Sequence, residues 1–456
     1  MAFKTFNRAL YAKIESAEGT LNAPVDTTDY IETTDPTFTV TNRMFDRNPT
    51  RMSITPAPAV VPGTAVSTPS ATVEFSFSVE MAGSGATGTE PRWGRLLEAC
   101  GLEKLTLDSV STDAFAGGAV NKPNCLLHAE RLSAGSGDTT FDSTGSAVLG
   151  RVVSDTFQSD STVYYVQGVG GGSNSGAANN DGVCGEVTNG VPLLTADAAS
   201  ETDVGFAYAP LSTNVLGGAN SSSLSMRLVY DVTSGAYIEA VGCRGSVEFA
   251  MTNGDRVLMN FTFTGRMSNY TATGTSNDAP QIAATTVPPA FVGVSLGIQD
   301  TSYAANSAAD YTGSIFSTMN INLGNEMAVR ESSSAASGYD VAYITGRTPT
   351  ATFNPDAVLE ATFPFWDQFL AGDVTRAKLT VGATAGNKFM MKMPAMQFTG
   401  IADGNRDEVF VYDSSTNLTG GDYGSSIQQS ASAAAAASTQ TNPRLGTNNE
   451  FVLFCI

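Results

Sequence analysis

The stretch from Val73 to Gly101 constrains the fold of this chain most, because it predicts a strand, a loop and a helix in direct succession. In VEFSFSVEM the apolar residues Val73, Phe75, Phe77, Val79 and Met81 alternate with polar ones. Alternation with a period of two is typical of a strand with one buried face and one solvated face. The sequence therefore predicts a half-buried strand up to Met81.

The second part of this stretch, RWGRLLEACG, predicts a short helix after the loop AGSGATGTEP. Proline is favourable in a first helical turn, where its missing N–H group would have no partner. Trp93, Leu96, Leu97 and Cys100 share one helical face, and Gly101 can supply a left-handed end. We therefore expect Trp93, Leu96 and Leu97 to anchor this helix on a sheet.

A divergent second copy of the unit follows later in the chain. VAYITGR (341–347), a loop and FWDQFLAG (365–372) repeat the order of strand, loop, helix and glycine, and Trp93 and Trp366 are the only two tryptophans. Two flanking segments also have counterparts: FTVTNRMFDR (38–47) is similar to MNINLGNEMAVR (319–330), and GDRVLMNFTFTG (254–265) to GNKFMMKMPAMQFTG (386–400). Four similarities in one order favour a duplication, in which Trp366 and Phe369 anchor the second helix.

Composition agrees with a mainly β protein of two or three domains. The chain has 456 residues, of which 15% are charged and 45 are glycine, and low charge with much Gly, Ser, Thr and Ala is typical of short strands joined by long loops. The formal net charge is −20. Such an acidic chain is not expected to hold nucleic acid through its phosphates.

The predicted organisation is two tandem domains with one insertion. Residues 1–20 are expected to form a short helix or an arm, since Phe3, Phe6 and Leu10 have helical spacing. The Gly-rich segment 105–203 has no counterpart in the second half and predicts an inserted, surface-facing β-rich subdomain. The predicted ranges are 1–104 with 204–305 for the first domain, 105–203 for the insertion and 306–456 for the second domain, with a low-complexity loop at 414–449.

Cysteine usage and hydropathy indicate folding in a reducing compartment. The five cysteines form no CxxC pair and include an odd one, so free buried thiols are expected. The first 20 residues lack the apolar core of a signal peptide, and no segment is long and apolar enough to span a membrane.

No catalytic pattern is present, so an enzyme is not expected. The chain has a single histidine, His128. Without a second histidine, the usual zinc sites and catalytic triads cannot be built. Gly83–Gly88 satisfies GxGxxG between a strand and a helix, but the strand alternates and Pro91 places the helix start after the third glycine. A flexible loop is favoured over a dinucleotide site there. The acidic run at 403–413 lacks the ligand spacing of a calcium loop and is interpreted as a solvated turn, without metal or cofactor.

Three segments resemble major tail proteins, the tail-tube proteins of long-tailed, non-contractile bacteriophages. FSVEMAGSGATGTEPRWGRLLEACGL is similar to the edge strand, GSG loop and P-x-W helix of that family. YDVTSGAYIEAVGCRGSVEFAMTNGDRVLMNFTFTG resembles its Gly-rich hairpin, and GNKFMMKMPAMQFTGIADGNRDEVFVYD with NNEFVLFCI its C-terminal strands. The resemblance covers about three quarters of the chain and excludes 105–203 and 414–449.

The resemblance implies tail-tube β-sandwich domains whose strands join between subunits into a barrel around a lumen, each with a short helix on its outer side. Rings of this kind stack into the tube through which DNA leaves the virion, without binding it. The implied partners are further copies of the chain, a tape measure protein, and terminator and tip proteins, with no membrane. Assembly in the host bacterial cytoplasm and a final place in the virion tail follow from the same resemblance.

Two questions about such a tube stay open from the sequence. The polar strand positions Glu74, Ser76, Ser78, Glu80 and Glu248 are expected to face the lumen, although they could instead face solvent outside. Two domains per chain favour a trimer with pseudo-sixfold symmetry over a hexamer of single sandwiches. The rival classes are another virion structural component, such as a decoration or baseplate protein, and a β-sandwich adhesin.

Overall fold

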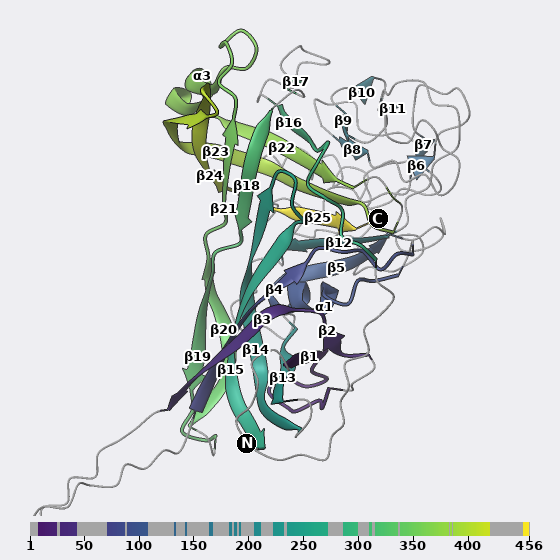
Figure 1. Cartoon of the computed structure of the whole chain (residues 1–456), viewed down its shortest axis with the longest axis vertical. Coiled ribbons are helices and arrows are strands. Elements are labelled where there is room, and N and C mark those ends of the chain that lie inside the picture. The colour runs from purple at the N-terminus through teal and green to yellow at the C-terminus, as the bar shows by residue number, and fades with distance from the viewer. Residues whose placement is uncertain are drawn as a thin grey trace, which may run out of the picture.

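The computed structural model is mainly β, with two short helices in the part of the chain that it describes (Figure 1). That part comprises residues 8–24, 28–42, 71–86, 89–107, 205–210, 222–231, 235–271, 286–299, 310–311, 315–335, 338–382, 384, 386–419 and 450–455, with short strands between 132 and 192. Seventeen strands belong to one large sheet, and every pairing between described strands is antiparallel. The predicted mainly β class is thereby confirmed.

The first half of the chain builds a series of seven paired strands. Its members are β1 (Ala9–Ile14), β2 (Tyr30–Ile31), β3 (Thr34–Asn42), β4 (Ala71–Glu80), β13 (Leu224–Asp231), β14 (Ala236–Thr252) and β15 (Leu258–Thr271). In space they follow the order β2–β1–β13–β14–β15–β4–β3. Helix α1 (Gly94–Ala99) follows β4, and β5 (Leu102–Leu107) pairs with β12 (Gly205–Pro210).

The second half repeats the same series of pairings. Its strands are β16 (Ser295–Gln299), β17 (Asp310–Tyr311), β18 (Phe316–Asn322), β21 (Thr350–Pro355), β22 (Val374–Val381), β23 (Phe389–Arg406) and β24 (Val409–Leu418). Their spatial order is β17–β16–β22–β23–β24–β21–β18, with α3 (Phe365–Ala371) between β21 and β22 in the chain. Strand for strand, this order matches the first half.

The remaining strands are additions to this repeated series. The hairpin of β19 (Asn325–Glu331) and β20 (Tyr339–Arg347) lies between β18 and β21 in the chain, and β25 (Val452–Cys455) pairs with both β12 and β23. Within the predicted insertion the strands are β6 (Leu132–Ser133), β7 (Asp142–Ser143), β8 (Tyr164–Val166), β9 (Gly182–Cys184), β10 (Val187–Thr188) and β11 (Val191–Pro192). The strands that flank the insertion, β5 and β12, pair with each other.

The matching strand order corrects two of the four sequence similarities. VAYITGR forms β20, which pairs with β19, whereas the strand that leads into α3 is β21. GNKFMMKMPAMQFTG begins β23, which takes the place of β14 and not that of GDRVLMNFTFTG in β15. Both errors have one cause. Neighbouring strands have the same alternation of apolar and polar residues, so each segment was matched to the strand next to its true counterpart. The similarity of FTVTN (38–42) to the start of MNINLGNEMAVR agrees with the strand order, since β3 and β18 hold equivalent places. Residues 43–47 lie outside the described residues, and NEMAVR belongs to the added strand β19.

Two further expectations change. The helix expected within residues 1–20 is wrong, because Ala9–Ile14 form β1 between β13 and β2, with residues buried on both faces. The loop expected from residue 414 starts later, because β24 continues to Leu418 with Ser414, Thr416 and Leu418 buried in alternation. Phe3, Phe6, His128 and residues 420–449 lie outside the described residues.

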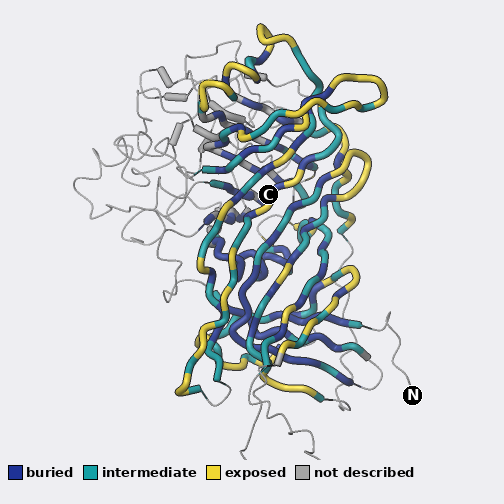
Figure 2. Tube along the Cα trace, turned by 90° about the vertical axis from the view of Figure 1, so that its left-hand side faces the viewer, coloured by how far each residue is buried: buried dark blue, intermediate teal, exposed yellow. Residues whose placement is uncertain are grey.

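One apolar core runs through both halves. The buried faces of β4, β14 and β15 supply Phe75, Phe249 and Phe263, while β21 and β23 supply Phe353 and Met391, all in one cluster. Figure 2 shows buried segments along the length of the molecule, with exposed segments at its ends and along turns. The two halves therefore share a single hydrophobic interior.

Candidate assembly surface

A continuous row of polar residues crosses eight strands of the sheet. The row joins directly opposed residues from β3 to β23 through both halves. Its members, in spatial order, are Thr34, Ser78, Asn260, Glu248, Asn322, Thr350, Asn417 and Gln397. None of them is a cation, and Ser78 donates a hydrogen bond to Asn260 Oδ1 at 2.7 Å. One face of the eight-stranded array is therefore polar at this level.

The adjacent row, along seven of these eight strands, is buried and, except for Thr416, apolar. It consists of Val79, Met259, Phe249, Ile321, Ala351, Thr416 and Phe398, each at most 3% exposed. Opposed residues in a sheet share a face and successive residues change face. The two rows together show that a single surface with one polar and one buried face passes from the first half into the second.

The predicted lumen residues lie on this polar face. Glu74 is exposed, whereas Ser76, Ser78, Glu80 and Glu248 are half-buried between core residues of the same strands. The predicted alternation along the strand is confirmed. Which way the face points in an assembly stays a prediction.

Two arginines, at the β14–β15 connection and at the end of β23, are neutralised by carboxylates. Arg256 pairs with Glu80 at 2.9 Å in the first half, and Arg406 pairs with Asp356 in the second. Glu74, Glu248 and Asp413 have no ion pair among the described residues. Arg266 lies on the same face, opposite Thr72, and donates to the Tyr339 and Gly19 carbonyls. Three carboxylates against this one guanidinium leave the described polar face with excess negative charge.

The two halves are joined by a strand pairing that uses only part of β14. Strand β13 covers β14 as far as Cys243, and β18 then pairs with the remainder, from Glu248 to Thr252. The hairpin β19–β20 also contacts β14, where Arg244 donates to the Ala342 carbonyl of β20. Arg244 is also paired with Glu18 of its own half at 2.6 Å. At this junction, the edge strand β18 of the second half therefore pairs with the part of β14 that β13 leaves uncovered.

Glycines in the GSG loop permit a second contact between the halves. The Gly83 amide donates to Asn387 Oδ1 at 2.8 Å, and the Gly85 amide donates to the Gly386 carbonyl at 3.2 Å. A Cβ atom at Gly83 would lie 1.9 Å from the Gly386 oxygen. The Gly83 and Gly85 amides therefore already donate hydrogen bonds within the chain and are not free to bind a phosphate. This agrees with the interpretation of GxGxxG as a loop.

Each end of the eight-stranded array has an unpaired edge among the described strands. Strand β3 pairs with β4 on one side, and its other edge is unpaired. Strand β23 is covered by β22 as far as Gln397, and on that side the segment from Phe398 to Arg406 is unpaired. These two edges are the counterparts of β18 and of the distal part of β14, which pair with each other inside the chain.

The two helices differ in how far they are covered. Trp93 donates from Nε1 to the Ala82 carbonyl at 2.8 Å, and Leu96 and Leu97 are 0% exposed. Trp366 is 40% exposed and donates from Nε1 to the Tyr412 hydroxyl at 3.2 Å, while Phe369 is half-buried. Trp93, Leu96 and Leu97 are thus fully packed, whereas Trp366 and Phe369 are only partly covered.

Polar groups around α1 hold it in place. Glu90 accepts hydrogen bonds from Lys104 at 2.8 Å and from the Tyr208 hydroxyl at 2.9 Å, and Lys104 lies 3.3 Å from Glu98. Burial raises the pKa of Glu98 above its ordinary value, against the opposing effect of Lys104. Burial also raises the pKa of the Tyr208 hydroxyl well above its ordinary range. These shifts accompany packing of the helix against β5 and β12.

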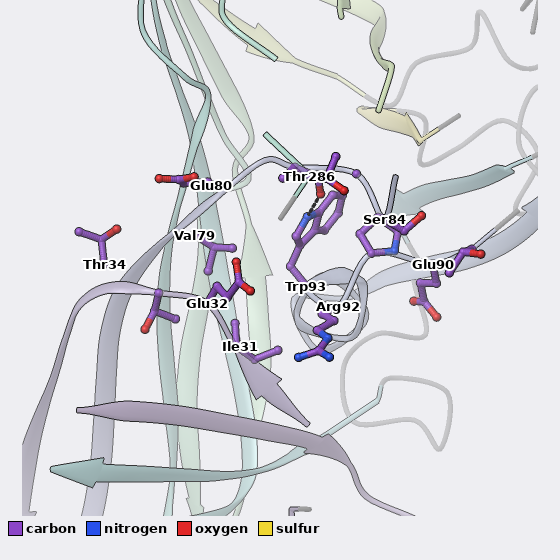
Figure 3. A pocket seen from close by; sticks show the side chains of 15 residues that line it. Ile31, Glu32, Thr34, Val79, Glu80, Ser84, Glu90, Arg92, Trp93 and Thr286 are labelled. Carbon is purple, nitrogen blue, oxygen red and sulfur yellow. Dashed lines mark hydrogen bonds between the residues drawn. The ribbon is translucent and has the colours of Figure 1, made fainter. Parts of the chain in front are cut away.

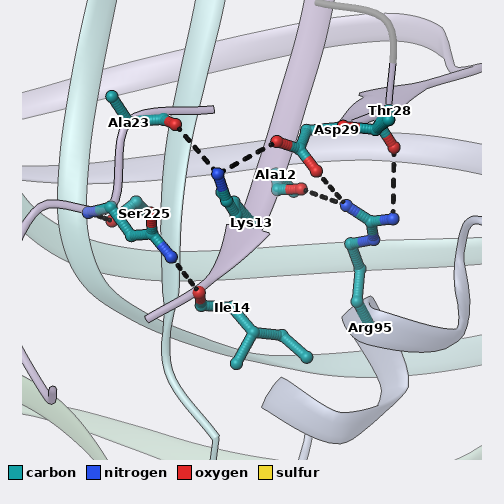
Figure 4. A network of polar contacts seen from close by, with 9 residues as sticks. Ala12, Lys13, Ile14, Ala23, Thr28, Asp29, Arg95 and Ser225 are labelled. Carbon is teal, nitrogen blue, oxygen red and sulfur yellow. Dashed lines mark hydrogen bonds and ion pairs between the residues drawn. The ribbon is translucent and has the colours of Figure 1, made fainter. Parts of the chain in front are cut away.

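Arg95 connects the other side of α1 to β1 (Figure 4). Its guanidinium contacts Asp29 Oδ1 at 2.7 Å and the Ala12 carbonyl at 3.0 Å, and Lys13 lies 3.7 Å from Asp29. Asp29 is only 5% exposed, so its charge is compensated by this pairing. This network, together with the contacts of Glu98, fixes the orientation of α1.

A cavity of 380 Å³ lies between β2–β3, the end of β4 and the start of α1 (Figure 3). Its charged lining consists of Glu32, Glu80, Glu90 and Arg92, beside the indole of Trp93. Three carboxylates against one guanidinium disfavour a phosphate ligand. The cavity therefore gives no support to a nucleotide site.

Within the ranges that the structure describes, no group of three or more His, Cys, Asp and Glu could hold a metal ion. Asp407 and Glu408 form the left-handed two-residue turn between β23 and β24, as in a type I′ hairpin, whereas Asp403 and Asp413 lie in these two strands. The solvated-turn interpretation therefore holds only for Asp407 and Glu408. The described chain also has no helix with the length and hydropathy of a membrane span.

Comparison with known proteins adds no relative. No protein-family model matches the chain, and no curated protein matches it significantly.

Proposed function

We propose that this chain is the tube-forming major tail protein of a long-tailed, non-contractile bacteriophage, and that it polymerises as stacked rings around a lumen for DNA. The observation that carries the proposal is the eight-stranded array with a polar face, which crosses both halves and ends in two unpaired edges. The resemblance of the GSG loop, the P-x-W helix and the closing strands to that family supplies the particular function.

The repeated strand order supports two tandem tail-tube domains in one chain. Seven strands and one helix recur in the same chain order, with the same antiparallel neighbours. Gly101 and Gly372 both follow their helices with positive φ, at 79° and 70°. Chance similarity between strands would not reproduce a whole pairing scheme. The finer assignment as β-sandwich domains, with boundaries near 104, 204 and 305, belongs to this proposal.

The internal junction suggests how chains join. Inside one chain, β18 pairs with β14 beyond the point where β13 ends. The equivalent contact between chains would place β3 of the next copy against β23 beyond Gln397. One contact repeated by rotation closes a ring, and it also pairs the strand edges that would otherwise promote aggregation. With two domains per chain, three chains would close a pseudo-sixfold ring.

The polar face supports the lumen assignment. DNA slides without being held if the wall offers no cations that can replace its counterions. Glu74 and Glu248 lie on this face, and Arg256 and Arg406 are paired with carboxylates. We therefore propose that Glu74, Ser76, Ser78, Glu80 and Glu248 face the channel. In this proposal α1 and α3 lie outside, and the tape measure, terminator and tip proteins are the further partners.

Electron microscopy of the purified full-length chain tests the function. Rings or hollow tubes whose reconstruction, calculated without imposed symmetry, contains three chains per ring would support it. Six chains per ring would overturn the tandem-domain arrangement. A chain that stays monomeric at high concentration, or that binds glycans as an adhesin would, contradicts the tube.

A further inference from the structure

Strand β3, whose outer edge is unpaired among the described strands, has a close counterpart in β18. Aligned without gaps, FTVTNRMFDR (38–47) and INLGNEMAVR (321–330) have three identical pairs, which are Asn42 with Asn325, Met44 with Met327, and Arg47 with Arg330. The alignment makes Thr39 equivalent to Asn322. Strand β18 pairs with β21 on one edge and with β14 on the other, so it shows what the free edge of β3 can bind.

The pairing of the strands extends this equivalence across both halves. Rows of directly opposed residues that start from Thr39 and Asn322 cross β3–β4–β15–β14 and β18–β21–β24–β23, which are equivalent strands. The first row consists of Thr39, Glu74, Thr264 and Arg244, and the second of Asn322, Thr350, Asn417 and Gln397. Gln397 is therefore the counterpart of Arg244.

An irregularity on the other edge of β14 and β23 gives the same result independently. Where β13 pairs with β14, the register shifts just before Cys243, and where β22 pairs with β23, it shifts just before Met396. The residues that follow these two shifts are Arg244 and Gln397. The alignment of the two halves is therefore fixed to the residue.

The internal junction has a defined register. Glu248 of β14, four residues beyond Arg244, lies directly opposite Asn322 of β18. In β23 the counterpart of Glu248 lies five residues beyond Gln397, because β23 has one extra residue after Phe398, where its pairing with β24 shifts. This counterpart is the residue against which a copied junction would place β3.

Ala402 is this counterpart, so copying the junction onto the open edges places Thr39 of one chain directly opposite Ala402 of another. Both side chains are exposed. Within the chain, Thr39 lies opposite Glu74 and Ala402 opposite Asp413, which are positions of the polar face. The pairing would therefore continue the polar face from one chain into the next.

The buried face of the same edges is incompletely covered. At the internal junction the Leu323 N–H donates to the Val247 carbonyl at 3.1 Å, and the two side chains are 0% and 1% exposed. Their counterparts at the open edges, Val40 and Ile401, pack against the core but are only half-buried. In the copied register these two residues lie opposite each other, so pairing of the edges would bury both.

The side chain of Asn325 distinguishes this register from a slipped one. Its amide donates to the carbonyls of Cys100, at the end of α1, and Gly245, in β14. A slip of two residues keeps every side chain on its face but moves the strand by about 7 Å, which would break both hydrogen bonds. Asn42 is the counterpart of Asn325 in β3, and the end of α3, before Gly372, is the counterpart of the end of α1.

We propose that β3 of a second copy of this chain pairs antiparallel with β23 in one register, with Thr39 opposite Ala402, and that Asn42 fixes this register by donating to the end of α3. The occupant of the β23 edge is a second copy because the chain already contains the matching contact between its own halves. This inference rests on the proposed function, since it specifies the residues that join neighbouring chains in the ring.

Cross-linking tests the register directly. Chains carrying Thr39→Cys are mixed with chains carrying Ala402→Cys, assembled and oxidised. Directly opposed β carbons lie about 5 Å apart, so a disulfide-linked heterodimer that neither variant forms alone is expected. Thr41→Cys is the matched control, because Thr41 is exposed on the same face but two residues out of register, and it should give at least about tenfold less heterodimer. Wild-type chains treated in the same way report any reaction of native cysteines, of which Cys100, Cys243 and Cys455 are buried.

The outcomes separate the contact from the tube. More heterodimer from Thr41→Cys than from Thr39→Cys would overturn the register, and tubes without either heterodimer would overturn the edge contact while leaving the tube intact. Disulfide-linked oligomers without tubes support the contact and contradict the tube, and monomers without disulfides contradict both.

A second measurement uses Asn42→Ala. Its monomer should unfold at the same urea concentration as the wild type, because Asn42 acts between chains, but it should need at least about tenfold more protein to assemble. Asn320→Ala is the matched control, since Asn320 is exposed on β18, which is already paired on both edges, and it should assemble normally. Normal assembly of Asn42→Ala would overturn the role of Asn42.

Discussion

The side-chain amide of Asn325 donates a hydrogen bond to the Cys100 carbonyl at 2.7 Å, so the first residue of β19 is tied to the end of α1 in the other half. The same amide donates to the Gly245 carbonyl at 2.9 Å, and the Asn325 backbone N–H donates to Ser246 Oγ at 3.1 Å. One side chain therefore connects the second half to both the helix and the sheet of the first.

Asn325→Ala should destabilise the chain by about 1–3 kcal/mol, because two carbonyl groups lose their donor in a partly buried place. Urea denaturation measures the change in the free energy of unfolding. Asn320→Ala is the matched control, since Asn320 is exposed on the polar face and should cost within about 0.5 kcal/mol. Equal effects of the two substitutions would show that the junction does not depend on Asn325.

Gly83→Ala should also destabilise the junction. The added Cβ would lie 1.9 Å from the Gly386 carbonyl oxygen, so two backbones would have to separate, at a cost of about 1–3 kcal/mol. The control is Gly346→Ala, where the nearest atom is the flexible end of Glu326 at 3.2 Å. Thermal unfolding should separate the two variants clearly. If Gly83→Ala unfolds like wild type, the close approach of the two loops is not required for stability.

Local patterns in the sequence predict much of this fold, and long-range pairing accounts for what they miss. The alternation around Phe75 and Phe77 and the helix after Pro91 depend on neighbouring residues, and both are confirmed. Strands β20 and β21 alternate alike, so sequence could not decide which one precedes α3. That decision depends on β21 pairing with β18 and β24, which come from distant parts of the chain.

The candidate surface was predictable only in part, for a related reason. Alternation places Glu74 and Glu248 on polar faces of their strands. It does not reveal that β14 and β18 merge two polar faces into one, because that register joins residues far apart in sequence. Likewise, the motif shared by α1 and α3 could not show that Trp93 is covered and Trp366 open. Burial of a helix depends on what the rest of the chain places against it.

The pH dependence of stability should include a contribution from Glu98. Burial raises its pKa above the ordinary 4.5, so between about pH 4.5 and the raised value the folded state binds more protons than the unfolded state. The contribution of this group is fully present below its unfolded pKa and is lost as pH rises through the folded pKa. Glu98→Gln should therefore weaken the fall in stability over this window, as measured by urea denaturation at several pH values. An unchanged pH profile would contradict this assignment.

The charge of the proposed lumen can be tested by reversing it. In Glu74→Lys/Glu248→Lys, tubes should still form, because Glu74 is exposed and Glu248 half-buried on the polar face, but the wall would then offer cations to phosphate. Short duplex DNA should bind these tubes, with affinity falling steeply as salt rises. Glu74→Gln/Glu248→Gln removes the same negative charge without adding cations and should bind little DNA. A reconstruction of the tube that places Glu74 on its outer surface would refute the lumen assignment regardless of binding.

The predicted insertion should be removable without loss of the fold. Leu107 at the end of β5 lies directly opposite Gly205 at the start of β12, so the chain leaves and re-enters the sheet at neighbouring positions. Replacing residues 108–204 by a Gly-containing loop of about four residues would convert β5 and β12 into an ordinary hairpin. Tyr208 and Lys104, which bind Glu90 beside α1, would be kept.

The shortened chain should unfold at a denaturant concentration close to that of the full-length chain and should still form rings and tubes, with a smaller outer diameter. Its control is a chain with the same loop but with Tyr208→Phe, which removes the hydroxyl that donates to Glu90 at 2.9 Å. That control should lose about 1–3 kcal/mol, because the Glu90 carboxylate loses one of its two hydrogen bonds and keeps only the one from Lys104. A deletion variant that folds but stays monomeric would show that residues 108–204 make the ring contact, and the insertion would then be part of the assembly surface.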